Sequence, residues 1–142
     1  MTPTTIRSPR RIAFRQHHAN GVLTVYPEDD DGVPFAILRV FTITGVSTNG
    51  ARADHAHRGC SQMLACLSGR VEVKINDGVE TATETLTAGG TSLLIPPLLW
   101  NSVTFEGPST VLAVFCDQLY DVADYIRDWD EYMRLKMAER GA

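Results

Sequence analysis

The sequence predicts an all-β fold, a barrel or sandwich of short strands followed by one C-terminal α-helix. From Gly21 to Cys116, short runs rich in β-branched and apolar residues alternate with Gly, Asn and Asp turn signals, at the spacing typical of sandwiches and barrels. After Asp121 the apolar residues recur at helical spacing instead. A chain of 142 residues can bury one core, so we expect a single domain over residues 1–142.

Composition narrows the classes of function. The chain is 44% apolar and 21% charged, which is typical of a soluble globular protein. Its net charge is −4 and its basic residues are scattered, which argues against nucleic acid as a partner. No apolar run is long enough to span a bilayer, and the first residues lack the apolar core of a secretory signal. Three cysteines without a CxxC motif fit a reducing compartment, so we expect a cytoplasmic protein.

The strands are expected in chain order after a start, residues 1–20, that has no strong period and should be extended or mobile. The run 70–75 alternates strictly between polar and apolar residues, and Asn76-Asp77-Gly78 then signals a tight turn. The run 111–116 is apolar on both faces, so it is either a central strand or part of a subunit contact. The expected strands are 21–26, 36–43, 62–67, 70–75, 81–86, 91–95, 103–105 and 111–116.

One amphipathic helix is expected over 122–139, packed on the β-domain. Asp121 can cap its N-terminus, and its aromatic stripe is interpreted as packing rather than as a ligand platform.

The most informative motif is His55-Ala56-His57. On a strand, the two imidazoles would point to the same face, with Ala56 opposite. Such a pair can share a metal ion, or one ring can act as a base near neutral pH. The alternative is a surface loop that holds two solvated histidines.

The surroundings of this pair resemble the two conserved motifs of the cupins, which implies a cupin-type β-barrel or jelly roll. The first motif lies around His55 and His57, with Gln62 at its Glu position and Gly69 as its closing Gly. The second lies over residues 90–105, with Asn101 where its His would stand. Because amide side chains are weak ligands for transition metals, we expect no metal at this site.

A closer resemblance covers residues 21–132, to the cupin-type 3,4-ketoisomerases that act on dTDP-4-keto-6-deoxy-hexoses. Three elements occur together in order: Arg52 with His55-Ala56-His57-Arg58, then Pro96-Pro97-Leu98-Leu99-Trp100, then Leu119-Tyr120-Asp121 with Asp124-Tyr125-Ile126-Arg127. The resemblance implies a homodimer that moves a keto group from C4 to C3 of a dTDP-linked sugar without any cofactor. A base would remove the C3 proton to give an enediolate, and a proton would return at C4.

The resemblance implies roles for seven residues. We favour His57 as the base and His55 as its partner, although the sequence does not fix the order. Arg52 and Arg39 are candidates for the diphosphate or the enolate oxygen, with a strand-end ion pair as the alternative for Arg39. Gln62 and Asn101 are expected to line the cavity, with the satisfaction of a buried backbone group as the alternative for Gln62. Trp100 is expected to stack on the base or sugar, unless it is a core residue.

Two departures from the family bear on the reaction. Phe41-Thr42 stands where family members carry two tyrosines, one of them regarded as an acid, and neither residue can donate a proton at neutral pH. Asn101 stands where they usually carry His. The proton would then come from Tyr26, His55 or water. Two alternatives follow, an epimerase acting in the same pocket and a non-catalytic sugar-binding cupin. The stereochemistry at C4 is not predicted.

Overall fold

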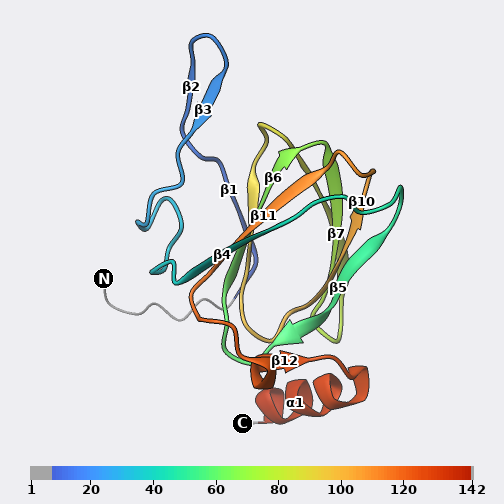
Figure 1. Ribbon diagram of the computed structural model, residues 1–142. Helices are drawn as coiled ribbons and strands as arrows, with labels where there is room; N and C mark the ends of the chain where they lie inside the picture. Colours follow the sequence, from blue (N-terminus) through green and yellow to red (C-terminus); the bar gives the residue numbers. More distant parts are fainter. Residues whose placement is uncertain (1–7, 142) are drawn as a thin grey trace.

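The computed structural model describes residues 8–141, which form two five-stranded antiparallel sheets packed face to face, with one α-helix at the end (Figure 1). The first sheet has the order β1-β9-β6-β11-β4 and the second has the order β12-β5-β10-β7-β8. A separate two-stranded hairpin, β2–β3, projects from the body of the molecule (Figure 1). The strands are β1 (Arg10–Ile12), β2 (Gln16–His18), β3 (Val22–Thr24), β4 (Arg39–Ile43), β5 (Ala51–His57), β6 (Gln62–Ser68), β7 (Arg70–Asn76), β8 (Thr81–Thr87), β9 (Ser92–Ile95), β10 (Trp100–Phe105), β11 (Val111–Cys116) and β12 (Tyr125–Ile126).

The main core lies between the two sheets and follows from the period-2 pattern of the strands. In β7, Val71, Val73 and Ile75 are buried while Glu72 and Lys74 are exposed, as the alternation predicted. Facing them from the other sheet, β6, β9 and β11 contribute further apolar side chains to the same cluster. Burying each such aliphatic side chain stabilises the fold by about 1.5–3 kcal/mol. Between the two sheets there is also a cavity lined in part by polar side chains, and the candidate site lies there.

The strands match the predicted fold class and most of the predicted segments. Strand β11 lies between β6 and β4 within its own sheet, so it is a central strand covered by its own chain. The expectation of extended backbone within residues 1–20 holds for β1 and β2. Residues 1–7 lie outside the described part, while β1 pairs with β9 and β2 pairs with β3.

The predicted helix over 122–139 was wrong in its first third. Residues 122–124 form a 3₁₀ turn that Asp121 caps by accepting a hydrogen bond from Ala123 N–H. Residues 125–126 are extended as β12, and α1 spans Trp129–Gly141. The backbone at β12 pairs with β5, and this tertiary pairing overrides the helical spacing of the side chains. Among the described residues, the structure has no helix long and apolar enough to cross a membrane.

Candidate active site

Strand β5 presents both histidines of the HAH motif to the same side. The ring centroids of His55 and His57 are 4.9 Å apart and the rings meet edge to face. Ala56 points the other way and is fully buried in a cluster with Trp100, Ile126 and Tyr132. The prediction that the pair lies on a strand is therefore confirmed, and the solvated-loop alternative is excluded.

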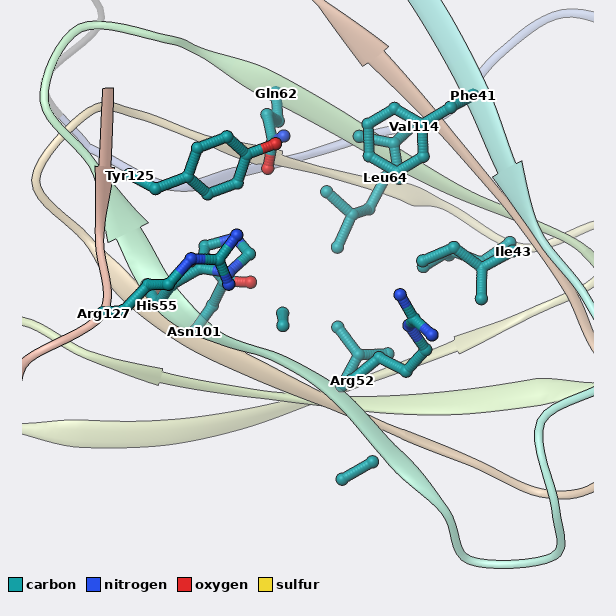
Figure 2. Close-up of a pocket in the computed structure, with 14 residues that line it drawn as sticks. Phe41, Ile43, Arg52, His55, Gln62, Leu64, Asn101, Val114, Tyr125 and Arg127 are labelled. Carbon is teal, nitrogen blue, oxygen red and sulfur yellow. The ribbon is translucent and has the colours of Figure 1, made fainter. Parts of the chain in front are cut away.

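His55 borders a cavity of about 340 Å³ between the two sheets (Figure 2). This volume is in the range of small-molecule sites. Both sheets contribute apolar side chains to its lining, and most of the polar ones lie on the side that holds His55, whereas Arg52 lies on the other side near Ile43 (Figure 2). The fourteen lining residues are Phe41, Ile43, Ala51, Arg52, Ala53, His55, Gln62, Leu64, Asn101, Val103, Leu112, Val114, Tyr125 and Arg127.

The short strand β12 supplies two of the polar lining residues. Its pairing with β5 sets Tyr125 opposite His57 and Ile126 opposite Ala56. Ile126 is fully buried, whereas Tyr125 and Arg127 both line the cavity. The Tyr125 ring lies 5.1 Å from that of His55 and 4.5 Å from that of His57, measured between centroids. A segment far along the chain thus forms the aromatic wall beside the two histidines.

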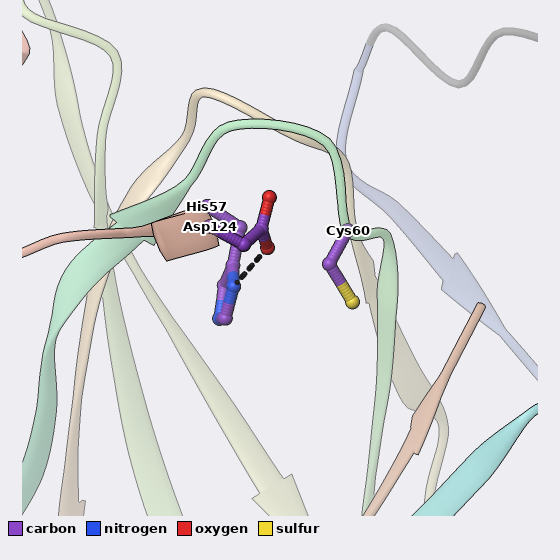
Figure 3. A group of neighbouring side chains, drawn as sticks. All are labelled: His57, Cys60 and Asp124. Atoms are coloured by element: carbon purple, nitrogen blue, oxygen red, sulfur yellow. Dashed lines mark hydrogen bonds and ion pairs between the residues drawn. The ribbon is translucent and has the colours of Figure 1, made fainter. Parts of the chain in front are cut away.

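His57 is not one of the residues that line the cavity, and its ring is held by Asp124 (Figure 3). Its Nδ1 lies 2.8 Å from Oδ2 of Asp124, and the other carboxylate oxygen accepts a hydrogen bond from Gly59 N–H at 2.7 Å. Because an ionised carboxylate only accepts hydrogen bonds, Nδ1 carries the proton and Nε2 is left as the basic nitrogen. Burial lowers the pKa of His57, while Asp124 opposes that shift.

His55 is the histidine that faces the cavity, and it is neutral at physiological pH. Burial is the main cause that lowers its pKa to about 4, and repulsion from the positive charge of Arg127, and from His57 whenever that ring is protonated, adds to the shift. A neutral imidazole in a cavity can accept a proton from a bound ligand.

The charged groups on the cavity wall are arginines. Arg52 comes from β5 and Arg127 follows β12, and the lining includes no carboxylate. Neither guanidinium forms an ion pair with any residue in the range 8–141. Two unpaired guanidiniums in a partly apolar cavity favour an anionic ligand, such as a diphosphate or an enolate.

Gln62 and Asn101 line the cavity as predicted, and both are almost completely buried. The Gln62 amide donates a hydrogen bond to Cys116 Sγ at 3.6 Å. The Asn101 amide donates to the carbonyls of Leu99 and His55 at 3.4 and 3.5 Å. These bonds fix both side chains on the cavity wall, Asn101 beside His55 and Gln62 beside Tyr125 (Figure 2).

Arg39 is close to the site but is not part of the cavity wall. Its guanidinium lies over the rings of Phe41 and Tyr120, at 5.3 and 5.6 Å, and donates to Cys116 Sγ at 3.5 Å. The alternative of a strand-end ion pair also fails, because Arg39 forms none with the described residues. Instead it lies beside Tyr125 and His57 and adds positive charge behind them.

Trp100 does not line the cavity, so the predicted stacking on a base or sugar is replaced by the core alternative. Its ring packs against Trp129 and Tyr132, and its Nε1–H donates to Asp54 Oδ1 at 3.0 Å. Asp54 and Ala53 both have positive φ, +64° and +71°, a conformation that costs non-glycine residues about 1–3 kcal/mol. The Trp100 hydrogen bond therefore helps to hold the bend in β5 that precedes His55.

One group of potential metal ligands occurs within the described residues: His57, Cys60 and Asp124, whose ligand atoms lie within 4.8 Å of one another (Figure 3). His57 and Asp124 already satisfy each other as a hydrogen-bonded pair. The third member of the group, Cys60, hydrogen-bonds instead to Cys116. This bond and the Arg39 guanidinium lower the pKa of Cys116 to about 6. We therefore assign Asp124 the role of fixing the ring of His57.

Sequence reasoning missed three functional side chains: Asp124, Tyr125 and Arg127. They belong to the Asp124-Tyr125-Ile126-Arg127 motif, but the helical spacing of the apolar residues predicts a helix there. Read as a strand, its period of 2 would have placed Tyr125 and Arg127 on the same face. Tyr26, one predicted proton source, lies elsewhere, in a cluster with Phe14 and Phe115.

Comparison with known proteins identifies the family. A family model described as "FdtA: WxcM-like, C-terminal" matches residues 7–137. The chain belongs to this family. It is also 31% identical over 107 residues to the TDP-4-oxo-6-deoxy-alpha-D-glucose-3,4-oxoisomerase of Aneurinibacillus thermoaerophilus, covering 75% of this chain and 77% of that protein. The resemblance found from the motifs is thus confirmed.

Solved structures of two family relatives have the same fold. One is a variant of the 3,4-ketoisomerase QdtA from Thermoanaerobacterium thermosaccharolyticum in complex with TDP-4-keto-6-deoxyglucose, with a TM-score of 0.87 at 30% identity, covering 94% of this chain and 96% of that one. The other is the WlaRB TDP-quinovose 3,4-ketoisomerase of Campylobacter jejuni, with a TM-score of 0.83 at 30% identity, covering 91% and 99%.

The low pKa of His55 predicts how stability depends on pH. Between pH 6.5 and about 4 the unfolded chain binds a proton at this position that the folded chain does not, so the free energy of unfolding falls as the pH falls through this window. Above pH 6.5 both states are neutral and the effect vanishes. Urea unfolding at several pH values measures it, and His55→Asn should reduce the pH dependence.

The exposed His17 on the hairpin provides the control, and His17→Asn should leave the pH dependence of His55 in place. If His55→Asn and wild type lost the same free energy of unfolding between pH 6.5 and 4, His55 would not be a buried neutral imidazole.

Proposed function

We propose that the protein is a cofactor-independent isomerase that moves a keto group between C4 and C3 of a dTDP-linked 6-deoxy-hexose. The observation that carries the proposal is the cavity itself, which combines a neutral histidine with two unpaired guanidiniums and no carboxylate. A base and a positive environment are the two requirements for removing a proton next to a carbonyl and stabilising the enediolate. Family relatives named as 3,4-ketoisomerases support the same reaction.

The ligand follows from the charge of the cavity and from the relatives. QdtA is described in complex with TDP-4-keto-6-deoxyglucose. The free guanidinium of Arg52 suits the diphosphate of such a ligand, because its planar fork matches paired phosphate oxygens. Arg127 lies nearer His55, whose pKa it lowers, so it suits the oxygen that becomes negative in the enediolate. The amides of Gln62 and Asn101 suit the sugar hydroxyls.

His55 is proposed as the base, in place of His57. Both rings are neutral, but His55 lines the cavity, whereas His57 is 4% exposed and lies behind it. The hydrogen bond to Asp124 gives His57 a positioning role, since it fixes the ring on which His55 and Tyr125 pack. An epimerase in the same pocket would also need a base, so the position of exchange and the product must be measured.

The reaction can be followed by NMR with dTDP-4-keto-6-deoxyglucose in D₂O. The wild-type protein should exchange the C3 hydrogen for deuterium and form the 3-keto sugar. His55→Asn should lower both rates by at least about 100-fold, the usual contribution of a general base. His57→Asn should lower them less, because it removes support rather than the base.

Three results would count against the proposal. A wild-type protein that binds dTDP but neither exchanges C3 nor forms product would be a non-catalytic sugar-binding protein. Inversion without keto transfer would identify an epimerase. Normal exchange in His55→Asn with none in His57→Asn would restore His57 as the base, provided that both variants melt near the wild-type temperature.

The protein is further proposed to be a homodimer, as the family resemblance implies. The support comes from hairpin β2–β3, which projects from the body and exposes Val22 and Leu23 to 58% and 61% (Figure 1). An isolated two-stranded hairpin is marginally stable in water, so we expect these apolar side chains to be buried against another protein surface. A second copy of the chain is the proposed cover. The three cysteines are free, which supports the proposed cytoplasmic location.

Light scattering tests the dimer, which should have twice the chain mass of 15.6 kDa. Leu23→Lys should shift the mass toward the monomer, because it places a charge in the contact. Val79→Lys, which is at a position of 71% exposure on the β7–β8 turn, should leave the mass unchanged. A wild-type monomer, or a dimer unaffected by Leu23→Lys, would contradict the proposed interface.

A further inference from the structure

The isomerisation needs a proton donor as well as a base, and the cavity wall narrows the choice. Among the fourteen lining residues, Tyr125 is the only one with a hydroxyl group, and none carries a carboxyl, thiol or ammonium group. The amides of Gln62 and Asn101 are not acids, and guanidinium groups do not release protons in proteins. Apart from His55, already assigned as the base, Tyr125 is the remaining ionisable acid.

The position of Tyr125 fits this task. Its ring lies edge-on to His55 with centroids 5.1 Å apart, and Figure 2 shows its hydroxyl end turned inward over the cavity. Phe41 also lines the cavity but has no hydroxyl, while Thr42, next to it on β4, is exposed. The phenol that the family places on this strand is thus absent, and β12 brings a different phenol to the same cavity.

The surroundings of Tyr125 suit an oxygen that becomes negative when its proton leaves. The Arg127 guanidinium lies over the Tyr125 ring, 4.6 Å from the centroid. The guanidinium of Arg39 lies beside the same phenol, although it is not part of the cavity wall. A phenolate formed here would face two positive charges, and these stabilise a negative charge more strongly at partly buried positions than in water.

We propose that Tyr125 is a catalytic residue that donates its hydroxyl proton to C4 of the enediolate, an assignment that rests on the proposed isomerisation. His55 takes the C3 proton and becomes an imidazolium, and the hydroxyl proton on O3 moves to O4. As the C3 carbonyl forms, C4 takes a proton from the hydroxyl group of Tyr125, which becomes a phenolate. The imidazolium of His55 then returns a proton to the phenolate, so both side chains are restored and no external oxidant or reductant is needed.

The test separates the two halves of the reaction with Tyr125→Phe. With dTDP-4-keto-6-deoxyglucose in D₂O, this variant should still exchange the C3 hydrogen, because His55 is intact. Formation of the 3-keto sugar should fall by at least about 100-fold, as expected when a general acid is removed. Retained exchange also shows that the variant is folded and binds the substrate.

Tyr120 provides a matched control. Its ring lies 5.8 Å from that of Tyr125, but the residue is 63% exposed and outside the cavity. Tyr120→Phe should therefore exchange C3 and form product at wild-type rates. Product formation by Tyr125→Phe at the wild-type rate would overturn the assignment. So would loss of both exchange and product with dTDP binding intact, because Tyr125 would then act before the enediolate forms. Failure of the wild-type protein itself would instead refute the proposed function.

Discussion

The site depends on the two-residue pairing between β12 and the end of β5. This pairing sets Tyr125 against His57 and Ile126 against Ala56, and it carries Asp124 to within 2.8 Å of the His57 ring. Without it, β5 would still present two histidines, but the cavity would lack its phenol and one guanidinium, and His57 would lack the carboxylate that fixes its ring. This short strand pairing thus gives the two histidines different surroundings: His55 lines the cavity, and His57 is held by Asp124.

The rest of the C-terminal segment stabilises that contact. Ile126 is fully buried, and Tyr132 of α1 is buried beneath it in the same cluster. The Tyr132 hydroxyl oxygen lies 2.9 and 3.0 Å from the backbone carbonyls of Leu98 and Asn76 and donates its one proton to this pair, which ties the helix to the body of the fold. Burial raises the pKa of Tyr132 to about 12, so this donor keeps its proton throughout the working pH range. The helix therefore has a structural role, and the residues that line the cavity come from the segment that precedes it.

The sequence predicted the parts of the site that depend on local pattern and not those that depend on tertiary pairing. The HAH spacing placed both histidines on one face, and Gln62 and Asn101 were correctly placed in the cavity. The sequence could not predict which histidine lines the cavity. That depends on the carboxylate of Asp124, which lies 67 positions further along the chain and holds the ring of His57. The sequence left two roles open for Trp100, stacking on a ligand or packing in the core, because large aromatic residues serve in both; the structure packs it in a buried cluster.

The most direct test is a crystal structure of the Tyr125→Phe variant with dTDP-4-keto-6-deoxyglucose bound, since this variant should hold the substrate without completing the reaction. The account predicts that the sugar occupies the cavity with C3 facing His55, C4 facing the ring at position 125, and the diphosphate at Arg52. A sugar whose C3 faces His57, or one bound outside this cavity, would contradict it.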